Sequence, residues 1–163
     1  MSNEESLTEI SIKIWEKVID VQMHFNDLCL RVRNFAVSIL GVLLGAAAIS
    51  YRFGSHASIF GISFHTSVIF ILLSMIIWLA FFLMDRYWYH ELLKGSVHHG
   101  QKIEDMLKEA HPEIMLAHSI RDQSHQSLGM NAARKLNIFY WGIFLIQLIG
   151  FALVLTGSIK IQN

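Results

Sequence analysis

The sequence predicts an all-α membrane protein with three transmembrane helices, a long N-terminal cytoplasmic helix, and a cytoplasmic helical hairpin between spans 2 and 3. Of the 163 residues, 53% are hydrophobic and 16% are charged, which is too apolar for an ordinary soluble domain. Three apolar stretches are long enough to cross a hydrocarbon core of about 30 Å as helices. A segment of helical periodicity precedes the first of them. We therefore expect residues 1–163 to form a single membrane domain.

Charge, cysteine count and length exclude several classes of protein. Thirteen Lys and Arg balance thirteen Asp and Glu, so the chain lacks the basic character of a nucleic-acid binder. Cys29 is the single cysteine, which excludes a disulfide framework within the chain. The length leaves no room for a second, large catalytic domain.

The first element, residues 1–34, is predicted to be a cytoplasmic amphipathic helix that begins in a capping box at Ser2 or Ser6. Charged and polar side chains form one narrow stripe, and apolar side chains form two lines. The stripe contains Glu9, Lys13, Glu16, Asp20, His24, Asp27 and Arg31. One apolar line contains Leu7, Ile10, Ile14, Val18, Val21, Phe25, Leu28 and Val32, and the other contains Ile12, Trp15, Ile19, Met23 and Leu30.

Each of the two apolar lines needs a neighbouring helix to cover it. We expect one neighbour to be the cytoplasmic segment of the same chain and the other to be an adjacent subunit packed as in a coiled coil. Trp15, Ile19 and Phe25 are therefore candidate oligomer contacts. The alternative is a helix lying on the membrane surface, but such helices usually carry a polar face rich in Lys and Arg, whereas this stripe mixes both signs.

The spans are predicted at residues 35–53, 67–84 and 138–156. In the first, Gly41, Gly45 and Ala48 form a small-residue pattern that allows a partner helix to approach closely, and they are candidate oligomer contacts. No ionisable residue lies in mid-span, which argues against a proton-coupled transporter. We expect Gln147, the polar residue in the third span, to form a hydrogen bond between helices.

Basic residues predict the orientation, because they are retained on the cytoplasmic side. Those before the first span are Lys13, Lys17, Arg31 and Arg33, and those between the second and third are Arg86, Lys94, Lys102, Lys108, Arg121, Arg134 and Lys135. The other side has only Arg52 and Lys160. We expect a cytoplasmic N-terminus, a short outer loop near residues 54–64 and a C-terminus outside.

The segment 85–136 is predicted to be cytoplasmic and helical. One helix continues from the second span to about Ala110, with His99 on its apolar side. A second helix is expected to start at Pro112, since proline is favoured in the first helical turn. His118 and His125 share a face with Arg121 and Asp122, which we interpret as a solvated stripe.

Six of the nine histidines lie in this segment, at His90, His98, His99, His111, His118 and His125. Zinc sites need three or four converging ligands, and no HExxH motif is present. We therefore predict no metal site, no cofactor and no catalytic residue, and we expect that the protein is not an enzyme. A pH-sensing role for the imidazoles stays open.

The run DRYWYHELLKGSVHHGQKIE, residues 85–104, together with the span layout, resembles the RipA-like family of small bacterial inner-membrane proteins. The resemblance implies an octameric assembly of the inner membrane with no known catalytic motif. It marks Arg86, His90, Leu93, Gly95 and Glu104 as positions for contacts between subunits or with lipid headgroups. More distantly, the chain looks like membrane effectors of bacterial defence systems, although no sensor domain is visible.

The leading hypothesis is a homo-oligomeric bacterial inner-membrane protein that acts as a non-enzymatic scaffold or a pore-like ring. Its expected partners are membrane lipids, further copies of the chain and a possible cytoplasmic protein. Candidate contacts on the cytoplasmic face are Asp85, Arg86, His90, His99 and Glu104. One alternative is a membrane-disrupting or channel effector switched by a cytoplasmic partner, and another is a histidine-rich metal or lipid-modifying enzyme.

Overall fold

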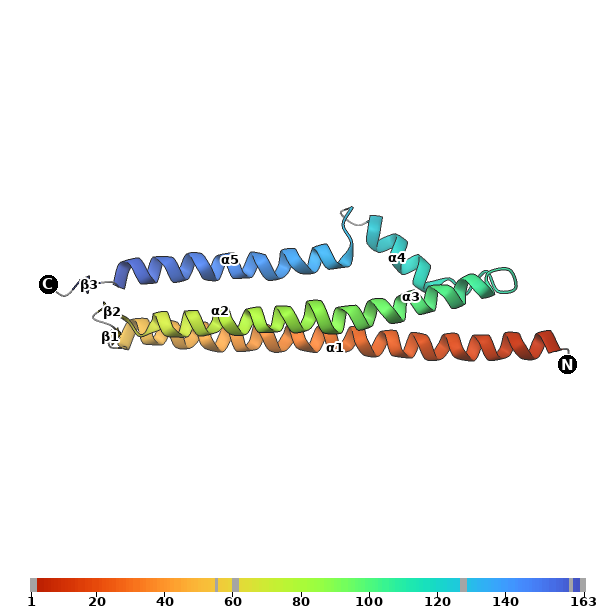
Figure 1. Cartoon of the computed structure of the whole chain (residues 1–163), viewed down its shortest axis with the longest axis horizontal. Coiled ribbons are helices and arrows are strands. Elements are labelled where there is room, and N and C mark those ends of the chain that lie inside the picture. The colour runs from red at the N-terminus through yellow and green to blue at the C-terminus, as the bar shows by residue number, and fades with distance from the viewer. Residues whose placement is uncertain (1–2, 55, 60–61, 127–128, 159, 162–163) are drawn as a thin grey trace. The chain divides into compact units, whose positions relative to one another are not determined.

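The computed structural model of the chain describes residues 3–54, 56–59, 62–126, 129–158 and 160–161, and most of them are helical (Figure 1). The helices are α1 (Asn3–Phe53), α2 (Ser67–Met84), the π-helical turn η1 (Asp85–Tyr89), α3 (His90–Leu107), α4 (Leu116–Gln126) and α5 (Ala132–Ser158). Three short strands complete the fold, namely β1 (His56–Ile59), β2 (Ile62–His65) and β3 (Lys160–Ile161).

Three helical segments are long and apolar enough to cross a membrane, as the sequence predicts. They are Ser6–Phe53, Ser67–Leu107 and Ala132–Gly157. The apolar stretches 35–53, 67–84 and 138–156 lie inside them. The first segment is part of one uninterrupted helix, because α1 contains neither Pro nor Gly before Gly41. Ser6 therefore lies inside the helix, and Ser2 lies outside the described residues.

The chain divides into two compact units. Unit 1 comprises Met1–Arg31 and Asp85–Leu136, and unit 2 comprises Val32–Met84 and Asn137–Asn163.

In unit 1, the N-terminal part of α1 packs against α3 (Figure 1). Gln22 Nε2 donates a hydrogen bond to the carbonyl oxygen of Ser96 at 3.2 Å. The two helices approach closely at Gly100, where a Cβ atom would collide with the side-chain amide of Gln22 and touch Val18. The buried apolar side chains of unit 1 include Cys29, Ile103, Leu107 and Ala117.

In unit 2, an apolar core forms around Ala47, Ile71 and Met75, with side chains of α5 packed against it. Trp78 is 1% exposed, and its Nε1 donates to the carbonyl oxygen of Tyr140 at 2.9 Å. Ser74 Oγ donates to Gln147 Oε1 across the helices at 3.4 Å. This contact confirms the predicted interhelical role of Gln147.

The predicted outer loop near residues 54–64 is instead a β-hairpin for most of its length. Strands β1 and β2 pair antiparallel, with His56 opposite His65 and Ala57 opposite Phe64. Strand β3 pairs with β2, which makes a sheet of order β1-β2-β3. This small sheet is an addition to the all-α fold. Sequence reasoning missed it because each strand is too short for a period-two pattern to stand out.

Two details of segment 85–136 also differ from prediction. The helix that was expected to start at Pro112 begins at Leu116, and residues before it form turns, including a bond from Ile114 N to His111 O. The helix from the second span reaches Leu107 but passes through η1. A π-turn holds one more residue than an α-turn, so it shifts the face that each following side chain occupies.

Candidate functional site

The carboxylate of Glu104 on α3 has no exposed surface and several hydrogen-bond partners. Its Oε1 atom accepts hydrogen bonds from Trp15 Nε1 at 3.2 Å and from Ala117 N at 2.7 Å. Its Oε2 atom accepts from His118 N at 3.1 Å, and His118 Nδ1 lies 2.8 Å away. Four donors around one carboxylate match its hydrogen-bonding capacity. We call these residues the Glu104 centre.

The Glu104 centre is a helix cap supplied from another helix. Ala117 and His118 are the second and third residues of α4, whose amide groups have no partner within the helix. A carboxylate at this end also complements the positive end of the helix dipole. Trp15 adds a contact from α1, so one side chain joins α1, α3 and α4.

The charge of Glu104 is stabilised in place. Burial by itself raises the pKa of a carboxyl group, but the hydrogen bonds from Ala117, His118 and Trp15 outweigh it and hold the pKa of Glu104 below its ordinary value. The centre therefore contains a carboxylate rather than a carboxylic acid at neutral pH. It is equipped to hold three helices together.

His118 corrects the prediction of a solvated stripe on α4. Besides its contact with Glu104, its Nε2 lies 3.3 Å from Asp105 Oδ1, and its side chain is only 16% exposed. Arg121 and Asp122 are exposed and pair with each other at 2.8 Å. The side chain of His125 lies outside the described part of the chain. The prediction failed because the buried acid that binds His118 comes from a different helix.

Three candidate residues of the cytoplasmic face, Asp85, Arg86 and His90, lie in or directly after the turn η1. Arg86 Nη1 donates to Glu91 Oε1 at 2.8 Å, a spacing of five residues that a π-turn brings into line. Hydrogen bonds from Lys94 and from Arg86 lower the pKa of Glu91. Asp85 is fully buried. His90 is also buried, and that burial, reinforced by the nearby Arg86, lowers the pKa of His90.

The other candidate contact residues are either half-buried or exposed. Ile19 and Phe25 are half-buried in α1, and His99 is exposed on α3, not on the buried side of that helix. The buried face of α3 instead contains Gly100, Ile103, Glu104 and Leu107. In unit 2, Gly41, Gly45 and Ala48 are exposed, and a Cβ atom on either glycine would meet nothing within 4 Å.

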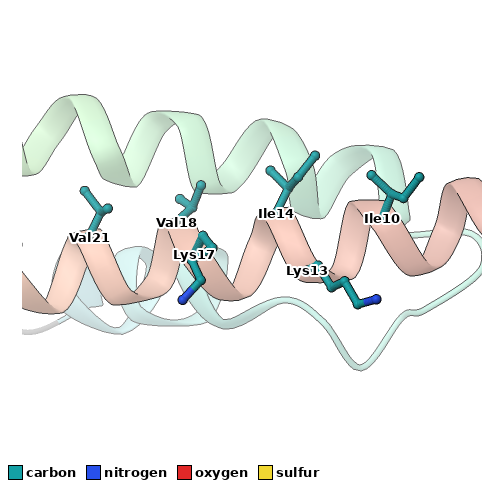
Figure 2. Close-up of a pocket in the computed structure, with 6 residues that line it drawn as sticks. All are labelled: Ile10, Lys13, Ile14, Lys17, Val18 and Val21. Carbon is teal, nitrogen blue, oxygen red and sulfur yellow. The ribbon is translucent and has the colours of Figure 1, made fainter.

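An apolar groove lies on the N-terminal half of α1, with a volume of about 400 Å³. Figure 2 shows its lining, in which the apolar side chains line one edge of the helix and the two lysines point to the other side. The lining residues are Ile10, Lys13, Ile14, Lys17, Val18 and Val21. Ile10, Ile14 and Val21 belong to the first predicted apolar line and are about half exposed.

Among the described residues, no group of three or more His, Cys, Asp or Glu side chains is placed to hold a metal ion. A pair of histidines does meet on the hairpin, where the rings of His56 and His65 lie 5.2 Å apart between centroids. Sequence reasoning overlooked this pair because the two residues become neighbours only through strand pairing.

Comparison of the chain with protein-family models, with curated proteins and with solved structures finds no match. The resemblance to the RipA-like family stays a prediction.

Proposed function

We propose that this protein is a homo-oligomeric bacterial inner-membrane protein that acts as a non-enzymatic scaffold or a pore-like ring. Residues 35–53, 67–84 and 138–156 would span the membrane, and unit 1 would lie on the cytoplasmic side. The proposal rests above all on one observation, which is an apolar line on α1 that extends well beyond the predicted span.

This line repeats every seven residues. It consists of Leu7, Ile14, Val21, Leu28, Phe35, Val42 and Ile49. Leu28 is half-buried, and the exposed fractions of the other six range from 45% for Val21 to 72% for Val42. A seven-residue apolar repeat is typical of a helix that packs along another helix.

Lipid alone would cover only part of the line. Phe35, Val42 and Ile49 lie within the first predicted span, where acyl chains can surround them. Leu7, Ile14 and Val21 lie before that span, where water would face them, and large exposed apolar patches in water mark interaction sites. A helix from a second copy would cover Leu7, Ile14 and Val21, the part of the line that lipid does not reach.

The charges beside the line favour a protein partner over a lipid surface. Lys13 pairs with Glu9 at 2.8 Å, and Lys17 pairs with Asp20 at 3.1 Å. These lysines are therefore compensated within the helix, whereas a helix that binds anionic lipid headgroups usually presents uncompensated basic charge.

The proposal is tested by the mass of the detergent-purified protein, measured by light scattering. We expect the wild-type chain to form an oligomer and the Leu7→Lys, Ile14→Lys double variant to dissociate, because two cations would have to be buried in the contact. Glu16→Lys, an exposed change elsewhere on the same helix, is the control and should leave the mass unchanged. A double variant with the wild-type mass would contradict the proposed contact.

A further inference from the structure

Helix α3 has an exposed line of residues with the same seven-residue spacing as the apolar line on α1. It consists of Leu92, His99 and Met106, which we call the α3 line. Leu92 is 42% exposed, Met106 is 72% exposed, and His99 is exposed between them. Residues seven apart lie on one face of a helix, two turns apart. Unit 1 therefore has two lines of equal spacing, one on α1 and one on α3.

From this match we propose that the apolar line on α1 of one copy packs against the α3 line of a second copy. The inference rests on the proposed function and names the surface that covers Ile14 and Val21. The same contact would remove Leu92 and Met106 from water, so both helices would bury apolar side chains that are exposed in a single chain.

The direction of the two helices follows from the packing within one copy. Trp15 on α1 donates to Glu104 on α3, and Gln22 donates to Ser96, so the two helices are antiparallel. Copies inserted in one bilayer with the same orientation differ by a rotation about the membrane normal and a shift in the membrane plane. Helix α1 of one copy is then antiparallel to α3 of its neighbour as well.

The same argument gives the register. Residues that are level within one copy stay level between copies, because neither movement changes height in the membrane. Ile14 is adjacent in sequence to Trp15. Its counterpart on α3 is Met106, two residues beyond Glu104, and a residue adds only about 1.5 Å of height. The facing pairs are Ile14 with Met106, Val21 with His99, and Leu28 with Leu92.

Charges beside the two lines are complementary in this register. At four positions an exposed or half-buried charge on α1 faces a charge of opposite sign on α3 or in the turn after it. The facing pairs are Lys13 with Glu109, Lys17 with Asp105, Asp20 with Lys102, and Arg31 with Glu91. Exposed ion pairs contribute little stability, but they select the partner and the direction of packing. Since Lys13 and Lys17 also line the groove on α1, this complementarity favours α3 of a second copy as its occupant.

Disulfide cross-linking between copies tests the contact. Ile14→Cys and Met106→Cys chains are produced together with tags of different mass, purified in detergent as mixed oligomers and oxidised. We expect disulfides between the two variants to dominate over those between two copies of one variant, and the tags identify each species on a non-reducing gel. Cys29 is buried, and the wild-type chain serves as the blank.

The matched control combines Ile14→Cys with Leu92→Cys. Leu92 lies on the same line of α3 but about 21 Å from Met106 along the helix, so this mixture should give no disulfide between variants. Equal yields in the two mixtures would overturn the register. Dominant disulfides between two Ile14→Cys chains would overturn the inference and leave the proposed oligomer intact. A monomeric mass without cross-linking would instead contradict the proposed function itself.

Charge reversal provides a second test that needs no cysteine. Asp20→Lys sets two cations opposite each other at Lys102 of the second copy and should weaken assembly about tenfold. Adding Lys102→Asp to the same chain restores opposite charges and should restore assembly. Glu16→Lys, the same reversal further round α1, should leave assembly unchanged. A double variant that assembles as weakly as Asp20→Lys alone would overturn the proposed pairing.

Discussion

At the scale of single residues, Glu104 has the clearest role, because its carboxylate lies on α3 and accepts hydrogen bonds from both α1 and α4. It caps the free amides of Ala117 and His118 and accepts the indole N–H of Trp15. Loss of such a partner leaves buried donors unsatisfied, which costs about 1–3 kcal/mol for each group. The arrangement of unit 1 therefore depends strongly on one charged side chain.

We predict that Glu104→Gln destabilises unit 1 by roughly 2–3 kcal/mol at neutral pH, because a charged acceptor of several hydrogen bonds becomes a neutral amide. The local readout is hydrogen exchange at the amides of Ala117 and His118, which should accelerate. Glu109→Gln, at an exposed position near the end of α3, is the control and should change neither quantity. Unaltered exchange at both amides in Glu104→Gln would rule out the cap.

Glu104 should also make the stability of unit 1 depend on pH. The pKa of Glu104 is lower in the folded chain than in the unfolded chain. The contribution of Glu104 to the free energy of unfolding is therefore complete above the unfolded pKa of about 4.3. It is lost as the pH falls through the lower, folded value. The difference in unfolding free energy between wild type and Glu104→Gln should be constant at neutral pH and shrink in acid. A difference that grew with acidification would contradict this reasoning.

At the scale of elements, the apolar helices could be predicted because their length and composition are local properties of the chain. The uninterrupted α1 also follows from its sequence, since nothing breaks the helix before Phe53. The start of α4 could not be predicted, because Leu116 begins the helix where a distant carboxylate supplies the cap. The strand pairing of His56 with His65 likewise depends on how two short segments meet, and neither segment signals it alone.

The small residues of α1 give a prediction at this scale. Gly41 and Gly45 face open space within the chain, so leucine side chains would fit there without a clash. We predict that Gly41→Leu with Gly45→Leu keeps the folded chain but dissociates the oligomer, because the added side chains would prevent close helix approach between copies. Helical content by circular dichroism and particle mass by light scattering are the two readouts.

The control for this variant is Gly142→Leu on α5, a position equally free of neighbours within the chain. It should retain the wild-type mass. If the double variant on α1 also retains that mass, these glycines do not lie between copies, and the contact must use other parts of the helix.

At the scale of the whole molecule, the sequence predicts a single membrane domain, and the structure divides into two compact units. The sequence does not predict how unit 1 is held together, because the Glu104 centre joins side chains from positions 15, 104 and 118. Those positions are brought together by tertiary packing. Periodicity in the sequence shows the part of the exposed apolar line that precedes the first span, but only the exposure of these side chains in the folded chain indicates that they need a partner.

The central claim is that several copies of this chain assemble around that line. The most direct test is a native mass spectrum of the wild-type protein purified in detergent. We predict a single species that contains several chains. A spectrum dominated by the monomer across detergents would contradict the claim, and the exposed line would then need a different partner.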